Sequence, residues 1–386
     1  MTRKSAIAVI GDLHYEPEQH DLYCRARQQI LQHSPDAILQ LGDEGGYSHC
    51  GTWRSFMEGL DFLDNFDLPF HTLIGNHDLE GCDYATDAQA VAAWCQAFER
   101  AQPYYSVDLG AAVGICLSTT RFRSNPGCRH EVYLDDVQVG WLRATLAQNR
   151  SRPTFVFSHA PVLGSGLRVL QSLHLKCPNA WINHTDRPER FIGLVRENPQ
   201  IKLWFSAHNH LGHCYGDSTS RVGGCTFVHT GVIGDASRDG CRQSRLVEFD
   251  EGEFVLATID HITGQRTDNV RHDYATGRDE RLCEPLIEQE CQHFAPPACP
   301  AGPGRLELGS SVFALHREML VEFDAALQAP LGVVIDRLAD QRPRVRDGRL
   351  ELVDLQGTVR VLKPNPLGRY YQVFEPNSSL EQRLSA

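Results

Sequence analysis

The chain has 386 residues, enough for a main domain and a smaller appendage, and its 41% hydrophobic and 22% charged residues are typical of globular proteins. The formal net charge of -12 argues against a nucleic-acid backbone as the main partner. Thirteen cysteines, scattered and without a Cys-x-x-Cys pair, indicate reduced thiols rather than a disulfide framework. The start, MTRKSAIAVIGD, has no signal-peptide core, and no stretch is apolar enough for a membrane helix, so we predict a cytoplasmic protein.

The first 283 residues alternate between short apolar runs and segments with helical spacing. Strands are predicted at 6–12, 36–43, 70–78, 104–110, 112–118, 153–161, 201–210, 225–231, 244–250 and 253–260. Helices are predicted at 22–32, 53–63, 87–100, 134–148 and 189–197, the fourth capped by Asp135. Repeated strand–helix–strand units predict a layered α/β fold, and we assign residues 1–283 to one domain.

A change of composition marks the C-terminal part. Residues 284–304 are rich in proline and glycine and read as a linker. We assign 305–386 to a small α+β extension, with a helix over 310–328 that starts at Ser310 or Ser311 and continues into 331–339. A hairpin is predicted over 349–362, with Gly357 at its turn. The role of the extension is open, and a homodimer formed through it is one hypothesis.

Polar side chains follow five of the predicted strands. The strand ends carry Asp12 and His14, Asp43, Asn76 to Asp78, His159, and His208 with His210. Residues two apart in an extended segment face the same way, so His208 and His210 can serve one ion or two adjacent ions. Ligands of α/β sheets bind beyond the carboxyl ends of the strands. We therefore expect these side chains to meet at one site.

The residue types at these strand ends are typical of metal ligands. Carboxylate, amide and imidazole groups suit two divalent ions such as Mn, Fe or Zn. Seven candidates are too many for one tetrahedral ion and fit two ions that share a carboxylate; they are Asp12, His14, Asp43, Asn76, His159, His208 and His210. Two adjacent metals are a recurring device for displacement at phosphorus.

The order of the motifs resembles the calcineurin-like metallophosphoesterase superfamily. The motifs are GDLH at 11–14, LGD at 41–43, GNHD at 75–78, FSHAP at 157–161 and SAHNH at 206–210. The likeness covers about residues 5 to 260 and implies a layered αββα sandwich. Ala207 stands where the pattern has glycine. In its motifs the chain most resembles the class III cyclic-nucleotide phosphodiesterase branch of this superfamily.

The resemblance implies a role for each candidate. One metal would be held by Asp12, His14 and His210, and the other by Asn76, His159 and His208. Asp43 would bridge the two ions, and a hydroxide between them would attack phosphorus. The catalytic residues would be His77, which stabilises the phosphate and protonates the leaving oxygen, and Asp78, which orients His77. No tyrosine ligand is assigned.

The leading functional hypothesis is a binuclear metal-dependent phosphoesterase. Its substrate would be a small-molecule phosphate ester, above all a phosphodiester or nucleotide. The alternatives are a phosphomonoesterase or a DNA nuclease on the same fold, and a non-catalytic protein-binding scaffold. The acidic balance speaks against the nuclease, and the filled ligand positions speak against the scaffold. Hypothetical substrate contacts, each equally consistent with an ordinary loop residue, are Tyr15, His20, Tyr47, His49, Arg121 and His229.

Overall fold

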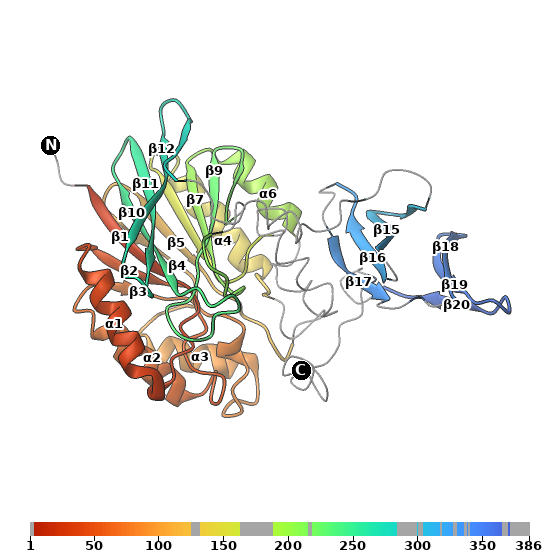
Figure 1. Cartoon of the computed structure of the whole chain (residues 1–386), viewed down its shortest axis with the longest axis horizontal. Helices are drawn as coiled ribbons and strands as arrows, with labels where there is room; N and C mark the ends of the chain where they lie inside the picture. Colours follow the sequence, from red (N-terminus) through yellow and green to blue (C-terminus); the bar gives the residue numbers. More distant parts are fainter. Residues whose placement is uncertain are drawn as a thin grey trace. The chain divides into compact units, whose positions relative to one another are not determined.

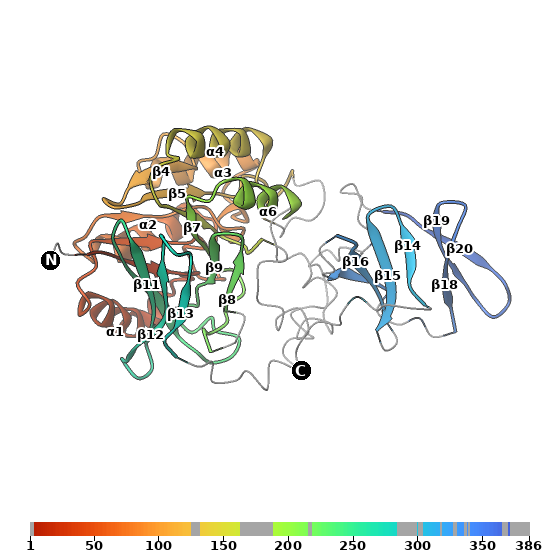
Figure 2. The same ribbon diagram turned by 90° about the horizontal axis from the view of Figure 1, so that it is seen from above.

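The computed structural model (Figures 1 and 2) describes residues 4–124, 132–162, 188–214 and 218–283, together with 299, 304–316, 319–326, 330–335, 338, 340–364 and 370. The described residues fall into two compact units, one within 4–283 and the other within 299–370. The predicted linker lies almost entirely outside the described residues, so the domain boundaries stay a prediction.

Two sheets form the centre of the first unit. The larger sheet has the order β13-β12-β11-β10-β1-β2-β3. Its strands are β1 (Ser5–Ile10), β2 (Ala37–Gln40), β3 (Phe70–His71), β10 (Gln243–Phe249), β11 (Glu253–Asp260), β12 (Arg266–Asp273) and β13 (Asp279–Arg281). The other sheet has the order β4-β5-β6-β7-β9-β8. Its strands are β4 (Tyr105–Asp108), β5 (Val113–Leu117), β6 (Thr154–Ser158), β7 (Ile201–Ser206), β8 (Thr219–Val222) and β9 (Cys225–His229).

Helices cover the outer face of each sheet (Figures 1 and 2). The helices α1 (His20–Leu31), α2 (Trp53–Asp64) and α3 (Asp87–Ala97) pack on the larger sheet, and α4 (Asp136–Gln148) and α6 (Pro188–Glu197) pack on the other. The alternation of β1 shows the layers: Ala8 and Ile10 face the helices, while Ile7 and Val9 face the second sheet. The predicted αββα sandwich is therefore confirmed. Asp135 caps α4 as expected, because its side chain accepts a hydrogen bond from Gln138 N.

Parallel pairing brings the ends of the motif-bearing strands together. Strand β1 runs parallel to β2, and β2 to β3; in the other sheet β6 runs parallel to β7. The predicted strand over 70–78 is shorter than expected, since only Phe70–His71 joins the ladder. Side chains satisfy the backbone that follows: the Tyr105 hydroxyl accepts from Thr72 N, and Ser118 Oγ accepts from Ile74 N. This segment is thus free to leave the sheet and carry Asn76 inward.

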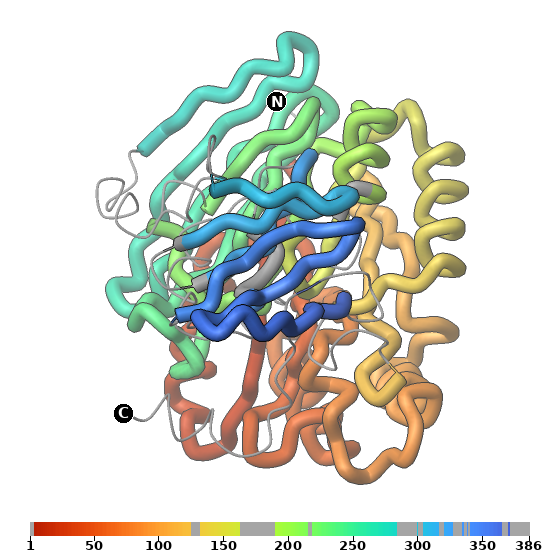
Figure 3. The backbone as a smooth tube through the Cα atoms, turned by 90° about the vertical axis from the view of Figure 1, so that its right-hand side faces the viewer, coloured from red at the N-terminus to blue at the C-terminus, as the bar shows by residue number. Residues whose placement is uncertain are grey.

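The described part of the C-terminal unit consists of strands, shown in blue in Figure 3. One antiparallel sheet contains β14 (Leu306–Leu308), β15 (Ser311–His316), β16 (Met319–Asp324) and β17 (Pro330–Ile335). A second contains β18 (Arg342–Arg346), β19 (Arg349–Val353) and β20 (Val359–Leu362). The predicted hairpin over 349–362 is confirmed, with Gly357 at a φ of 82°.

The helix predicted over 310–328, and its continuation into 331–339, are wrong. Strands β15 and β16 pair antiparallel over this stretch, and β17 follows. Both faces of β15 are covered, because Val312 and Ala314 belong to one apolar cluster and Phe313 to another. A strand buried on both faces shows a continuous apolar run instead of alternation, and such a run is easily read as a helix.

None of the described helices combines the length and the apolar composition that crossing a membrane requires.

Candidate metal centre

The loops after the strands hold the predicted ligands in a strained backbone. Four of them have a positive φ: His14 (41°), Asp43 (57°), His208 (67°) and His210 (53°). Side chains other than glycine rarely adopt this region, and such strain gathers at functional sites. Ala207, which replaces the pattern's glycine, is buried between the sheets, and the unusual φ falls on the next residue, His208.

Glycines let two of these loops touch backbone to backbone. A Cβ on Gly75 would lie 2.1 Å from Asp43 Oδ1, and a Cβ on Gly42 would lie 2.4 Å from the backbone nitrogen of Gly75. Gly42 also has a φ of +90°, which favours glycine. The glycines of the Gly-Asp and Gly-Asn motifs thereby bring Asp43 against the loop of Asn76.

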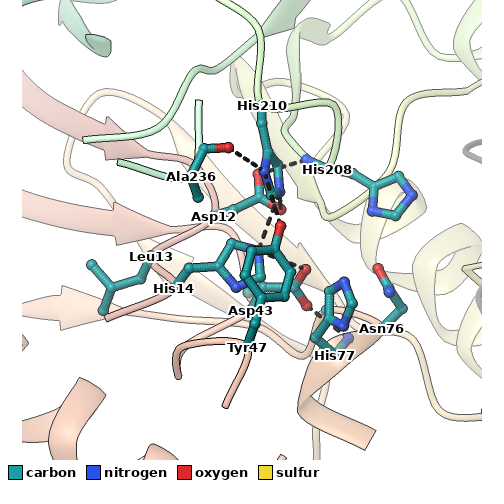
Figure 4. A network of polar contacts seen from close by, with 12 residues as sticks. Asp12, Leu13, His14, Asp43, Tyr47, Asn76, His77, His208, His210 and Ala236 are labelled. Carbon is teal, nitrogen blue, oxygen red and sulfur yellow. Dashed lines mark hydrogen bonds and ion pairs between the residues drawn. The ribbon is translucent and has the colours of Figure 1, made fainter. Parts of the chain in front are cut away.

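The first group of ligand atoms contains Asp12, His14, Asp43 and His210 (Figure 4). The Nε2 atoms of His14 and His210 are 3.2 Å apart. Asp12 Oδ1 lies 3.1 Å from His210 Nε2, and Asp43 Oδ2 lies 3.7 Å from His14 Nε2. Four donors of three different strand ends thus converge on one small volume.

The second group contains Asp12, Asp43, His159 and His208, with Asn76 beside it. His159 Nε2 lies 3.0 Å from His208 Nδ1 and 3.0 Å from Asn76 Oδ1. The same nitrogen lies 3.2 Å from Asp43 Oδ2 and 3.6 Å from Asp12 Oδ1. All seven predicted ligands are therefore brought together, and both Asp12 and Asp43 belong to the two groups.

Backbone carbonyls set the orientation of three imidazoles. The Nδ1 atoms of His159, His210 and His14 lie 2.7, 2.9 and 3.2 Å from the carbonyl oxygens of Leu41, Ala236 and Gly45. A proton on Nδ1 satisfies each contact and leaves the Nε2 lone pair facing the centre of the cluster. Lone pairs that face one another at this spacing repel, and a cation between them removes the conflict.

The two carboxylates are prepared for positive charge. One oxygen of each is held by a backbone amide: His208 N donates to Asp12 Oδ2 at 2.7 Å, and His77 N donates to Asp43 Oδ1 at 2.9 Å. The other oxygens, Asp12 Oδ1 and Asp43 Oδ2, are buried without a hydrogen-bond partner among the described residues. Buried oxygens of this kind need a counter-charge, and divalent cations meet the need. The donor set therefore fits two metal ions.

The pKa values in the cluster agree with this fit. Burial raises the pKa of Asp12, but the charges of His210 and His159 outweigh it and hold the pKa well below its ordinary value. Burial lowers the pKa of His159, yet the charges of Asp43 and Asp12 raise it to about 9. A proton and a cation thus compete for His159, and metal binding would release the proton.

Asp78 was expected to orient His77, but the structure gives the two residues different partners. Asp78 accepts hydrogen bonds from the backbone amides of Asp43, Glu44 and Gly75, each at 2.8 Å. His77 Nδ1 instead lies 3.0 Å from Glu80 Oε2, one helical turn further along the chain. Asp78 therefore ties the ligand loops together, and Glu80 is the carboxylate that orients His77. The spacing of His77 and Glu80 was the available signal in the sequence.

Tyr47 stands over the ligand cluster (Figure 4). Its ring stacks on His14 with centroids 4.3 Å apart and meets His77 edge-on at 5.4 Å. Its hydroxyl lies 3.3 Å from His210 Nδ1, and the residue is 53% exposed. Tyr47 is thus a surface residue in direct contact with ligand side chains, in keeping with its predicted place around the site.

The other hypothetical substrate contacts have partners elsewhere. Tyr15 packs in the core against Tyr23 and Phe62, and its hydroxyl contacts His20. The remaining three pair as follows: His49 with Glu58, Arg121 with the ring of Tyr133, and the buried His229 with the carbonyl of Leu211. A residue that the sequence reasoning missed is Arg238, whose backbone amide donates to the carbonyl of His210 at 3.0 Å.

Comparisons with known proteins agree with this architecture. A family model described as calcineurin-like phosphoesterase matches residues 5–212. The chain is 24% identical over 217 residues to the glycerophosphodiester phosphodiesterase GpdQ of Enterobacter lignolyticus (strain SCF1), over 53% of this chain and 70% of that protein. A solved dimetal phosphatase from Danio rerio superposes with a TM-score of 0.51 at 12% identity, over 69% of this chain and 98% of that one. The likeness to the solved structure concerns the fold alone.

Proposed function

The chain belongs to the calcineurin-like phosphoesterase family, and we propose that it hydrolyses a small-molecule phosphodiester or nucleotide with two divalent cations of the Mn, Fe or Zn type. The family model and the relatives above support a metal-dependent phosphoester hydrolase. The preference for a diester is the finer part of the proposal. It is supported by the likeness to a glycerophosphodiester phosphodiesterase.

The observation that carries the proposal is the pair of ligand groups that share Asp12 and Asp43, each with a buried oxygen lacking a hydrogen bond among the described residues. Bound there, two divalent cations would supply hydroxide at neutral pH and neutralise the charge of the phosphate. Asp43 is the proposed bridge, since its Oδ2 faces both His14 and His159.

His77 is the proposed acid for the leaving oxygen. Because its Nδ1 faces Glu80, we assign Nε2 to the substrate. Burial lowers the pKa of His77, but the charges of Asp43 and Glu80 outweigh it and raise the pKa well above its ordinary value. A protonated imidazole is thereby favoured at neutral pH, which suits a group that donates to the departing alkoxide.

Metal reloading tests the cofactor part of the proposal. Protein stripped with a chelator and reloaded with Mn, Fe, Zn, Ca or Mg is assayed for bound ions and for hydrolysis of bis(p-nitrophenyl) phosphate. Mn, Fe or Zn should restore turnover, while the imidazole-rich ligand set disfavours Ca and Mg. Asp43→Asn serves as the paired variant and should stay inactive with every metal. Activity in the stripped protein equal to that of the reloaded protein would refute the two-metal mechanism.

Matched substrates test the diester preference. The reloaded enzyme is compared on p-nitrophenyl phosphate, its bis ester, a glycerophosphodiester and a cyclic nucleotide, and kcat/KM is expected to be highest for a diester. A higher value for the monoester would favour the phosphomonoesterase. DNA duplexes at low and high salt test the nuclease, against which the net charge of -12 speaks. Inertness toward all of them with two ions bound would overturn the function.

Two further predictions remain separate from this activity. One is the cytoplasmic location. The other is a homodimer formed through residues 305–386, and light scattering on the full chain would measure the oligomeric state.

A further inference from the structure

A second cluster of metal-ligand types lies beside the loop of His210. The Sγ atoms of Cys214 and Cys241 and a carboxylate oxygen of Asp239 all lie within 4.8 Å of one another, and the three residues are half-buried. We propose that Cys214, Asp239 and Cys241 bind a third divalent cation, of the zinc class, which fastens the loop that holds His210.

Hydrogen bonds hold Asp239 in place before any ion binds. Its Oδ1 accepts from Ser237 Oγ and from Cys241 N, each at 3.0 Å, and its Oδ2 accepts from Gly212 N at 2.8 Å. The carboxylate therefore connects the segment of Cys241 to the segment of Cys214. Each oxygen retains acceptor capacity for a cation, because a carboxylate offers about four acceptor positions.

Gly212 provides the room for the Cys241 side chain. A Cβ at position 212 would lie 2.5 Å from Cys241 Cβ and 2.9 Å from its Sγ. Any larger residue would push the thiol out of the cluster. The close approach of the two segments thus depends on a glycine that is placed directly against one of the proposed ligands.

The donor set favours a soft divalent cation over a disulfide. Two sulfurs and one carboxylate are ligands typical of zinc, with water in the fourth tetrahedral position. Cys214 and Cys241 are free thiols in the structure, although their Sγ atoms lie within the same cluster. Binding of a cation would release one proton from each thiol to solvent.

The cluster is joined to the proposed active centre through His210. The carbonyl of Ala236 holds His210 Nδ1, and the amide of Arg238 donates to the carbonyl of His210. Both residues belong to the segment that continues into Asp239 and Cys241. An ion that ties this segment to Cys214 would therefore fix the orientation of His210, and its loss should weaken metal binding at His210 about tenfold.

Metal counting tests the proposal. The full chain is loaded with zinc, dialysed and analysed by mass spectrometry of metals, and the wild type should hold three ions per chain. Cys241→Ser should hold two, while Cys82→Ser, which removes an exposed cysteine outside the cluster, should hold three. In the cobalt-loaded protein, thiolate-to-cobalt absorption should vanish in Cys241→Ser and persist in Asp43→Asn. The last variant separates this site from the dinuclear one.

A readout on the wild type covers the case in which the variant fails to fold. Zinc should protect Cys214 and Cys241 from alkylation, as peptide mapping would detect. Equal zinc content in the wild type and Cys241→Ser, unchanged alkylation with zinc, or a Cys214–Cys241 disulfide in protein that binds no thiolate metal would each overturn the third site.

Discussion

The floor of the proposed active site and its rim differ in how they meet solvent. We call the seven predicted ligands the floor, and none of them is more than 6% exposed. The rim comprises Tyr47, which is 53% exposed, and the side chains of His77 and Glu80, which are 23% and 17% exposed. The floor is a buried and strained arrangement of charge, suited to hold cations. The rim borders solvent, where a substrate arrives, so the two regions should fail in different ways when altered.

The largest effect is expected at the floor, from Asp43→Ala. Its Oδ2 faces ligands of both groups, so its removal should empty both metal positions and abolish turnover. Metal analysis after dialysis and a diester assay check this outcome, with Asp64→Ala at the exposed end of α2 as the control. Two ions retained at the dinuclear centre would show that Asp43 is not the bridge.

At the rim, His77→Ala should remove turnover while leaving the metals. A general acid contributes about a hundredfold to ten-thousandfold in rate, and kcat should fall by that factor. Metal content should match the wild type, because the side chain of His77 is outside both ligand groups. Loss of metal together with turnover would show that His77 is a metal ligand and belongs to the floor.

The two carboxylates that follow His77 sharpen the comparison, because they have different partners. Asp78 accepts hydrogen bonds from the backbone amides of Asp43, Glu44 and Gly75, in the loops that carry floor residues, so Asp78→Asn turns an amide toward these donors. Loss of charged hydrogen bonds in a buried place costs about 2–3 kcal/mol. The variant should unfold at lower urea concentration and bind metal more weakly. Wild-type stability would contradict the assignment of Asp78 to the floor.

Glu80→Gln should act on the rim alone. The amide keeps a hydrogen-bond acceptor near His77 Nδ1 but loses the charge that orients the imidazole and stabilises its protonated form. We expect kcat to fall about tenfold, with KM, metal content and unfolding midpoint unchanged. Restoration of turnover in Glu80→Asp would support the charge as the cause. A change in KM without a change in kcat would assign Glu80 to substrate binding instead.

The floor could be predicted from the sequence, and the rim largely could not. Each floor residue lies within five residues after the end of a strand. Parallel strands deliver such residues to one edge of the sheet. The partner of His77 depends on a short turn, where Asp78 faces inward and Glu80 faces the imidazole. The spacing of His77 and Glu80 in GNHDLEG allows this contact, but the letters alone do not show which of the two carboxylates faces the imidazole.

The C-terminal unit shows a different limit. Spacing around Phe313 fits a helix, yet the residue lies in β15 because apolar neighbours cover both faces of the strand. The spacing of apolar residues distinguishes helix from strand when one face of the element is exposed to solvent. It no longer does so when both faces are buried. In the first unit, helices with one wet face, such as α2 and α4, were placed to within two residues.

The smallest expected effect concerns Tyr47, whose ring connects floor and rim. It stacks on His14 and leaves more than half of its surface to solvent, so it is placed to contact a bound ester. An aromatic contact contributes about 0.5–1.5 kcal/mol, so Tyr47→Ala should raise KM roughly twofold to tenfold with little change in kcat. Tyr47→Phe keeps the ring and should match the wild type. A KM raised equally in both variants would assign the contact to the hydroxyl beside His210, and an unchanged KM in Tyr47→Ala would place the substrate elsewhere on the rim.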